Sequence, residues 1–115
     1  MSAPQVVDIA AGEWREHARF KGILMKGLLS TEDNSLASVN AVRVPLGGII
    51  GRHHHATQCE TVYVLAGESL LTLGDTQVSF NAGQVVAIPP MLDHALQNNG
   101  STLVELLTFF TPPLI

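Results

Sequence analysis

The sequence contains few of the residues that several classes of protein require. Its single cysteine, Cys59, excludes an internal disulfide bond and favours a reducing compartment, so we expect a cytoplasmic protein. Only 6 of the 115 residues are Lys or Arg and the net charge is −4, which leaves too little basic surface to bind nucleic acid. No apolar run reaches the roughly 18 residues of a membrane span, and the N-terminus has no signal-peptide pattern. We therefore expect neither a nucleic-acid partner nor a membrane.

Charge of either sign is also scarce in this chain. Charged residues make up 14% of the sequence, against roughly 25% in ordinary soluble domains, whereas apolar residues make up 46%. A domain of 115 residues has only a modest core, so part of this apolar complement should remain on its surface. Because association buries exposed apolar surface, the composition predicts a homodimer.

Short apolar segments separated by turn residues occupy most of the chain. The predicted strands lie at residues 22–29, 36–44, 50–56, 61–66, 68–73, 76–80, 85–88, 94–98 and 102–110. A tight hairpin is predicted at Gly74-Asp75, where glycine supplies a positive φ. Many short strands at such regular spacing are typical of an all-β sandwich or barrel. Residues 11–20 fit either a short helix or an irregular segment.

Side chains that commonly bind metals gather near the middle of the chain. His53, His55 and Glu60 fall within eight positions, and His94 follows downstream. Alternation along a strand places His53 and His55 on one face and His54 on the opposite face. Imidazole suits Zn, Cu, Fe and Ni, and an added carboxylate retains Fe and Mn as candidates. The pattern indicates a metal site.

Two spaced motifs carry these residues. The first reads Gly47, five residues, His53, one residue, His55, four residues, Glu60, six residues and Gly67; the second reads Gly83, five residues, Pro89, four residues, His94, three residues and Asn98. Both motifs, at residues 47–67 and 83–98, closely resemble the paired motifs of the cupin superfamily, and the chain is similar to small single-domain cupins. The second motif departs from the family pattern at Met91, where glycine is usual.

The resemblance implies both a fold and a ligand set. The fold is a single cupin β-barrel of the jelly-roll type, spanning residues 1–115 and built from two antiparallel sheets. The cofactor is one divalent transition metal (Fe, Mn, Ni or Zn), held by His53, His55, Glu60 and His94. Four protein ligands leave coordination positions open for water or substrate, unlike a closed structural site.

Three functions are compatible with such a site. The preferred hypothesis is Lewis-acid isomerase or lyase chemistry on a small oxygen-rich substrate, either a keto acid or a sugar acid, with Glu60 as the candidate catalytic group. The second is an Fe(II)-dependent dioxygenase. The third is a non-catalytic cupin that binds a sugar or another small effector. In each case the partner is a small molecule, and the fold by itself favours none of the three.

Strand parity and position predict where other residues of chemical interest lie. Cys59 and Tyr63 have opposite parity to Glu60, so both should face away from the site, with Cys59 buried as an inert thiol. His17 lies outside both motifs and is predicted to lie on the surface. The candidates for lining a pocket beside the metal are Gln58, Asn40, Arg43 and Gln97.

Overall fold

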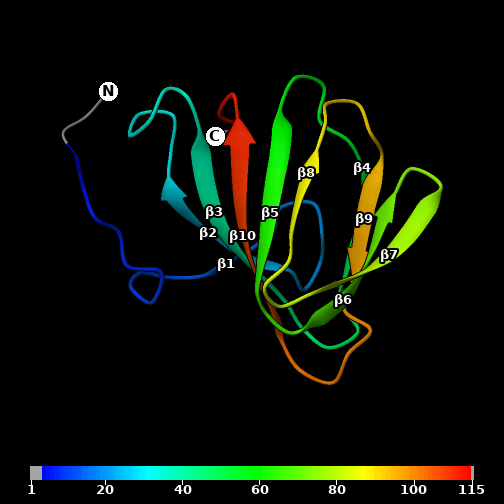
Figure 1. Cartoon of the computed structure of the whole chain (residues 1–115). Helices are drawn as coiled ribbons and strands as arrows, with labels where there is room; N and C mark the ends of the chain where they lie inside the picture. Colours follow the sequence, from blue (N-terminus) through cyan, green and yellow to red (C-terminus); the bar gives the residue numbers. More distant parts are fainter. Residues whose placement is uncertain (1–3, 115) are drawn as a thin grey trace.

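The computed structural model describes residues 4–114, which form two antiparallel β-sheets (Figure 1). The larger sheet has the strand order β1 (Arg15–Glu16), β2 (Leu24–Leu29), β3 (Ser38–Val44), β10 (Val104–Thr111), β5 (Cys59–Ala66) and β8 (Val85–Ile88). The smaller sheet has the order β4 (Ile49–His53), β9 (His94–Gln97), β6 (Glu68–Leu73) and β7 (Thr76–Asn81). Within residues 4–114 there is no helix, and hence none that could cross a membrane.

Strand β10 shows how the sequence specifies a sheet with one buried face. Val104, Leu106, Thr108 and Phe110 are buried, and the residues between them are only partly buried. This period of two directs every second side chain toward the interior. Because β10 pairs with β3 on one side and β5 on the other, its inward face forms the centre of the larger sheet. The predicted all-β fold is therefore confirmed.

The predicted hairpin is also present. Strands β6 and β7 pair in register from Glu68↔Asn81 to Leu73↔Thr76, which leaves a two-residue turn. Gly74 in that turn has a φ of +60°, a conformation that glycine adopts without steric cost. The sequence positions of the other strands agree with the structure to within a few residues.

Residues 11–20 form a largely irregular segment rather than the short helix that the sequence also allowed. The segment contains only the two-residue strand β1, in which Arg15 pairs with Met25 of β2, and the helical alternative is wrong. Positive φ values at Gly12 and Gly22 turn the chain at either end of the segment. The edge of β2 supplies hydrogen-bond partners for this backbone, and that long-range pairing takes precedence over local propensity.

The core lies between the two sheets. Its buried apolar residues come from both layers and comprise Ile23, Val42, Val44, Val62, Val64, Leu71, Phe80, Ile88, Leu96, Val104 and Leu106. A pocket of about 290 Å³ opens between the sheets, and several of these core residues form its walls. The fold thus places the ends of β4, β5 and β9 around one apolar cavity.

Candidate metal centre

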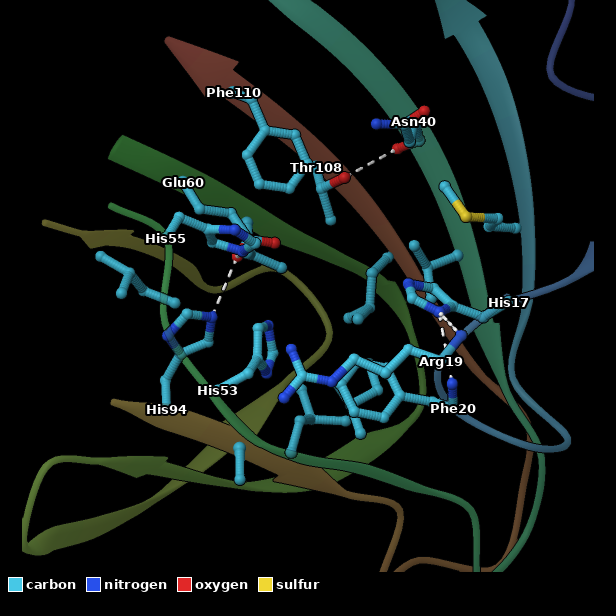
Figure 2. A pocket seen from close by; sticks show the side chains of 18 of the residues that line it. His17, Arg19, Phe20, Asn40, His53, His55, Glu60, His94, Thr108 and Phe110 are labelled. Atoms are coloured by element: carbon cyan, nitrogen blue, oxygen red, sulfur yellow. Dashed lines mark hydrogen bonds and ion pairs between the residues drawn. The ribbon is translucent and has the colours of Figure 1, made fainter. Parts of the chain in front are cut away.

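The four predicted metal ligands converge inside this pocket (Figure 2). His53 is the last residue of β4, and it pairs in register with His94, the first residue of β9. Glu60 is the second residue of β5 in the opposite sheet, and His55 lies in the connection between β4 and β5. One ligand atom from each residue lies within 4.8 Å of the others. Both sheets therefore contribute side chains to a single polar cluster.

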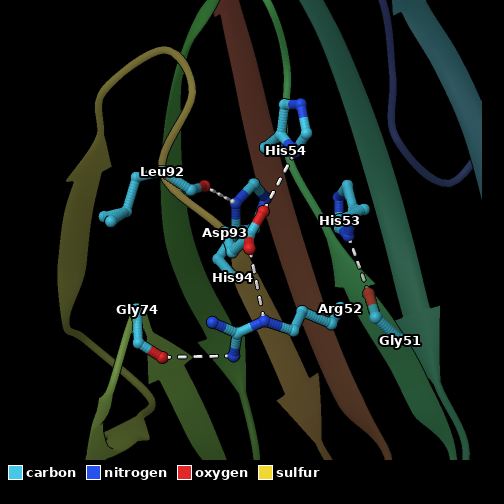
Figure 3. Close-up of polar contacts among 8 residues, drawn as sticks. All are labelled: Gly51, Arg52, His53, His54, Gly74, Leu92, Asp93 and His94. Carbon is cyan, nitrogen blue, oxygen red and sulfur yellow. Dashed lines mark hydrogen bonds and ion pairs between the residues drawn. The ribbon is translucent and has the colours of Figure 1, made fainter.

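Backbone carbonyl groups orient two of the imidazole rings (Figure 3). His53 Nδ1 lies 2.8 Å from the carbonyl oxygen of Gly51, and His94 Nδ1 lies 3.0 Å from that of Leu92. When Nδ1–H donates to a carbonyl, Nε2 retains its lone pair and becomes the nitrogen available to a metal. The carbonyls thereby fix the ring orientation and direct the Nε2 atoms of His53 and His94 toward the cluster.

Glu60 supplies a buried negative charge. Its side chain is largely buried, and its Oε1 lies 3.1 Å from His94 Nε2 and 3.4 Å from His55 Nε2. Burial by itself raises the pKa of Glu60, but the contacts with His55 and His94 outweigh it and bring the pKa to about 2. Burial lowers the pKa of His94, but its hydrogen bond to Glu60 and other contacts raise it above the ordinary value overall. Glu60 is therefore a carboxylate at neutral pH.

This cluster fits a divalent transition metal. His55 Nε2 is buried and makes no aligned hydrogen bond, which is costly for a polar atom unless another group satisfies it. Ligands at about 2.1 Å from a metal lie at most about 4.2 Å apart, so the observed spread of up to 4.8 Å requires only a small contraction. Three imidazoles and one carboxylate also match the donor types that first-row metals prefer.

His54 faces away from the four ligands, as strand parity predicted. Its Nδ1 lies 2.9 Å from Asp93 Oδ1, and its side chain is 45% exposed (Figure 3). Arg52 Nε lies 3.4 Å from the other oxygen of Asp93, and the same guanidinium reaches the carbonyl of Gly74 at 3.1 Å. Asp93 thus links the segment that carries His53 to the segment that carries His94, on the outer side of the site.

Met91 adopts the conformation that glycine would provide. Its φ is +69°, in the left-handed region, and its side chain is exposed and lines no part of the pocket. The Met91 backbone N–H donates to the carbonyl oxygen of His55 at 2.8 Å. The substitution of the usual glycine therefore leaves the ligand-bearing loop in place, at the cost of backbone strain.

The pocket has apolar walls and a small set of polar lining residues in addition to the four ligands. The polar ones are His17, Arg19, Asn40 and Thr108. His17, predicted to lie on the surface, is half-buried and also lines the pocket, because the turn at residues 17–20 brings it there. Of the four residues considered as pocket-lining from the sequence, only Asn40 lines it; Gln58, Arg43 and Gln97 do not. Asn40 is 4% exposed, and its Nδ2 has no hydrogen-bond partner.

The sequence contains no local signal that would have identified the contribution of residues 17–20. This segment precedes the first ligand by more than thirty positions and belongs to neither motif. Cys59 and Tyr63, by contrast, are placed as parity predicted, since neither lines the pocket. Tyr63 is 38% exposed, and Cys59 is half-buried rather than fully buried.

The chain is similar in sequence and in fold to several known proteins. An oxalate-binding protein from Thermotoga maritima is 31% identical over 85 residues, which cover 72% of this chain and 70% of that protein. An uncharacterized protein from Methanocaldococcus jannaschii is 33% identical over 70 residues, which cover 61% of this chain but only 56% of the relative. The crystal structure of a predicted oxalate decarboxylase from Thermotoga maritima has a TM-score of 0.85 and 25% identity, covering 94% of this chain and 99% of that one.

A family match agrees with these similarities. The family model for the cupin domain matches residues 40–110, a range that contains both motifs and all four residues of the cluster. The TM-score of 0.85 shows that the chain shares its fold with the predicted oxalate decarboxylase described above. The chain therefore belongs to the cupin family.

Proposed function

We propose that His53, His55, Glu60 and His94 bind one divalent transition metal, and that the loaded site binds small dicarboxylates of the oxalate class. The observation that carries this proposal is the convergence of four ligand atoms within 4.8 Å inside an apolar pocket, where the buried His55 Nε2 makes no aligned hydrogen bond. The similarity to a protein named as oxalate-binding and to a solved structure named as a predicted oxalate decarboxylase, both from Thermotoga maritima, supports the choice of ligand class.

The chain's own residues prepare the pocket for such a ligand. A bound metal would supply Lewis acidity and open coordination positions for carboxylate oxygens. His53 and His94 hold their rings through Nδ1–H bonds to backbone carbonyls, which limits the reorganisation needed for binding. The apolar walls exclude water, and electrostatic attraction between the site and an anion is stronger where water is excluded.

A catalytic role is the second candidate, and the position of Glu60 favours it. If Glu60 binds the metal through one oxygen, its second carboxylate oxygen is available to accept a proton from a bound acid. The pKa of about 2 keeps Glu60 unprotonated at neutral pH but also makes it a weak base, so proton removal would depend on the acidity that a bound metal would give the substrate. This arrangement suits isomerase or lyase chemistry on a keto acid or sugar acid.

Metal-dependent binding of oxalate tests the proposal. We expect calorimetric titration to show oxalate binding to protein loaded with Mn(II) or Ni(II) and none to protein stripped with a chelator, because without the metal the pocket has no coordination positions and presents the Glu60 carboxylate to a dianion. Equal binding by the two forms would contradict a metal-centred site.

Turnover assays separate the functional alternatives once binding is established. Product formed from oxalate or a keto acid without O₂ indicates lyase or isomerase chemistry. O₂ consumption only with Fe(II) indicates a dioxygenase. Ligand binding without turnover, with any of the four candidate metals, indicates a binding protein.

We also propose that the chain forms a homodimer through the outer face of the larger sheet. Tyr63 and Leu65 on β5 and Val85 on β8 are 38%, 42% and 63% exposed, and Tyr63 pairs in register with Val85. An uncharged apolar patch is self-complementary, as a two-fold interface requires.

Sedimentation velocity should give about twice the 12.3 kDa chain mass for the wild type and the monomer mass for Val85→Asp. Val6→Asp, at an exposed residue outside this patch, is the control, and a monomeric wild type would contradict the proposal.

A further inference from the structure

The segment from His17 to Phe20 forms part of the pocket wall. We propose that Arg19, in this segment, makes the site bind dianionic ligands in preference to monoanionic ones. Among residues 4–114, Arg19 is the one Lys or Arg that lines the pocket. Its guanidinium carbon lies 5.3 Å from the centroid of the Phe20 ring, and that ring lies 5.1 Å from the ring of His53. In Figure 2 the Arg19 side chain extends along Phe20 toward the side of the pocket that holds His53. The inference rests on the proposed metal site and specifies the charge of its ligand.

The net charge of the metal-loaded site explains why a dianionic ligand would need Arg19. A divalent ion held by three neutral imidazoles and the Glu60 carboxylate has one net positive charge. A monocarboxylate neutralises that charge, whereas a dicarboxylate leaves one negative charge in a pocket with apolar walls. An uncompensated charge in such surroundings is strongly unfavourable. The guanidinium of Arg19 supplies the missing positive charge, and its planar geometry suits a carboxylate.

Local hydrogen bonds fix the backbone from which the Arg19 side chain extends. His17 Nδ1 accepts from the backbone N–H of Arg19 at 3.0 Å and from that of Phe20 at 3.3 Å. The backbone N–H of His17 donates to the backbone carbonyl of Ile23 at 2.7 Å, which fixes the start of the turn. Both burial and the charge of Arg19 lower the pKa of His17, so its Nδ1 stays unprotonated and able to accept these bonds at neutral pH. His17 is therefore a positioning residue for Arg19.

The first test compares two ligands that differ in charge. Oxalate is a dianion and glycolate is a monoanion, and both offer two oxygens to a metal. In calorimetric titrations of Mn(II)-loaded protein, Arg19→Gln should weaken oxalate binding by about tenfold, the effect of one charge-assisted hydrogen bond, and change glycolate binding by less than about twofold. Added NaCl should weaken oxalate binding by the wild type more than by the variant. Lys21→Gln is the matched control, because Lys21 is exposed in the same region but does not line the pocket.

The second test addresses how Arg19 is held. His17→Ala removes the acceptor and should weaken oxalate binding toward the level of Arg19→Gln. His17→Asn should restore most of the affinity, because an asparagine oxygen can accept from the backbone N–H two residues later. If His17→Ala binds oxalate as tightly as the wild type, the positioning role is wrong.

The outcomes distinguish this inference from the proposal on which it rests. If the metal-loaded wild type binds neither acid, the proposed function fails. If it binds both acids but Arg19→Gln weakens both equally, weakens neither, or behaves like Lys21→Gln, the selection of dianions by Arg19 is overturned and the metal site stands.

Discussion

Replacing His94 with alanine is expected to leave the purified protein essentially without metal. His94 is 5% exposed, its Nε2 lies 3.1 Å from Glu60 Oε1, and its ring is held by the Leu92 carbonyl. Loss of a residue that merely supports a metal ligand weakens metal binding by about 10–100-fold, so loss of a ligand should exceed that range. Metal content by mass spectrometry after dialysis, together with chelator competition, measures the effect.

His54→Ala provides the matched control for that variant. It removes an imidazole next to two ligands, but this ring contacts Asp93 on the outer side of the site. We expect its metal content to remain close to that of the wild type. If His54→Ala loses the metal and His94→Ala retains it, the assignment of ligands is wrong.

Replacing Gly67 with alanine is expected to destabilise the fold severely. Gly67 has a φ of +93°, and a Cβ there would lie 2.6 Å from the carbonyl oxygen of Leu103 and 2.9 Å from Val104 Cα. Both atoms belong to the backbone where the chain enters β10, so neither can move aside easily. Left-handed strain and overpacking together should reduce the free energy of unfolding by about 2–5 kcal/mol. Urea unfolding measures this as a lower midpoint at an unchanged slope.

Gly83→Ala separates the two causes. Gly83 has a similar φ of +88°, but nothing lies within 4 Å of the position that its Cβ would occupy. Only the backbone strain should remain, so we expect a loss of about 1–2 kcal/mol. Equal losses at Gly67 and Gly83 would show that close packing against Val104 contributes nothing.

The cluster of four candidate metal ligands could be predicted because its signals are local in the sequence. A period of two in a strand separates His53 and His55 from His54, and the spacing to Glu60 and His94 completes a recognisable pair of motifs. The structure adds what spacing alone does not give, namely that β4 and β9 pair so that His53 lies opposite His94. The apolar walls of the pocket likewise follow from strand alternation.

The N-terminal segment could not be predicted because long-range contacts determine its path. Lys26 Nζ donates to the carbonyls of Ile9 and Ala11 at 2.8 and 2.7 Å. The Trp14 ring lies 4.7 Å from Lys26 Nζ and 4.1 Å from the Arg43 guanidinium carbon, so two cations bind it to β2 and β3. These partners lie up to 29 positions from Trp14, beyond the reach of any local pattern. The turn at residues 17–20 is likewise distant in sequence from the four candidate ligands, so its position in the pocket wall could not be predicted either.

Anomalous diffraction from crystals of the protein grown with Mn(II) and oxalate tests directly whether the four residues form a metal centre. We expect one anomalous peak among the Nε2 atoms of His53, His55 and His94 and a carboxylate oxygen of Glu60, with oxalate bound to the metal on the pocket side. A peak at the exposed His54–Asp93 pair instead, or no peak in the pocket, would contradict the assignment of this cluster as a metal centre.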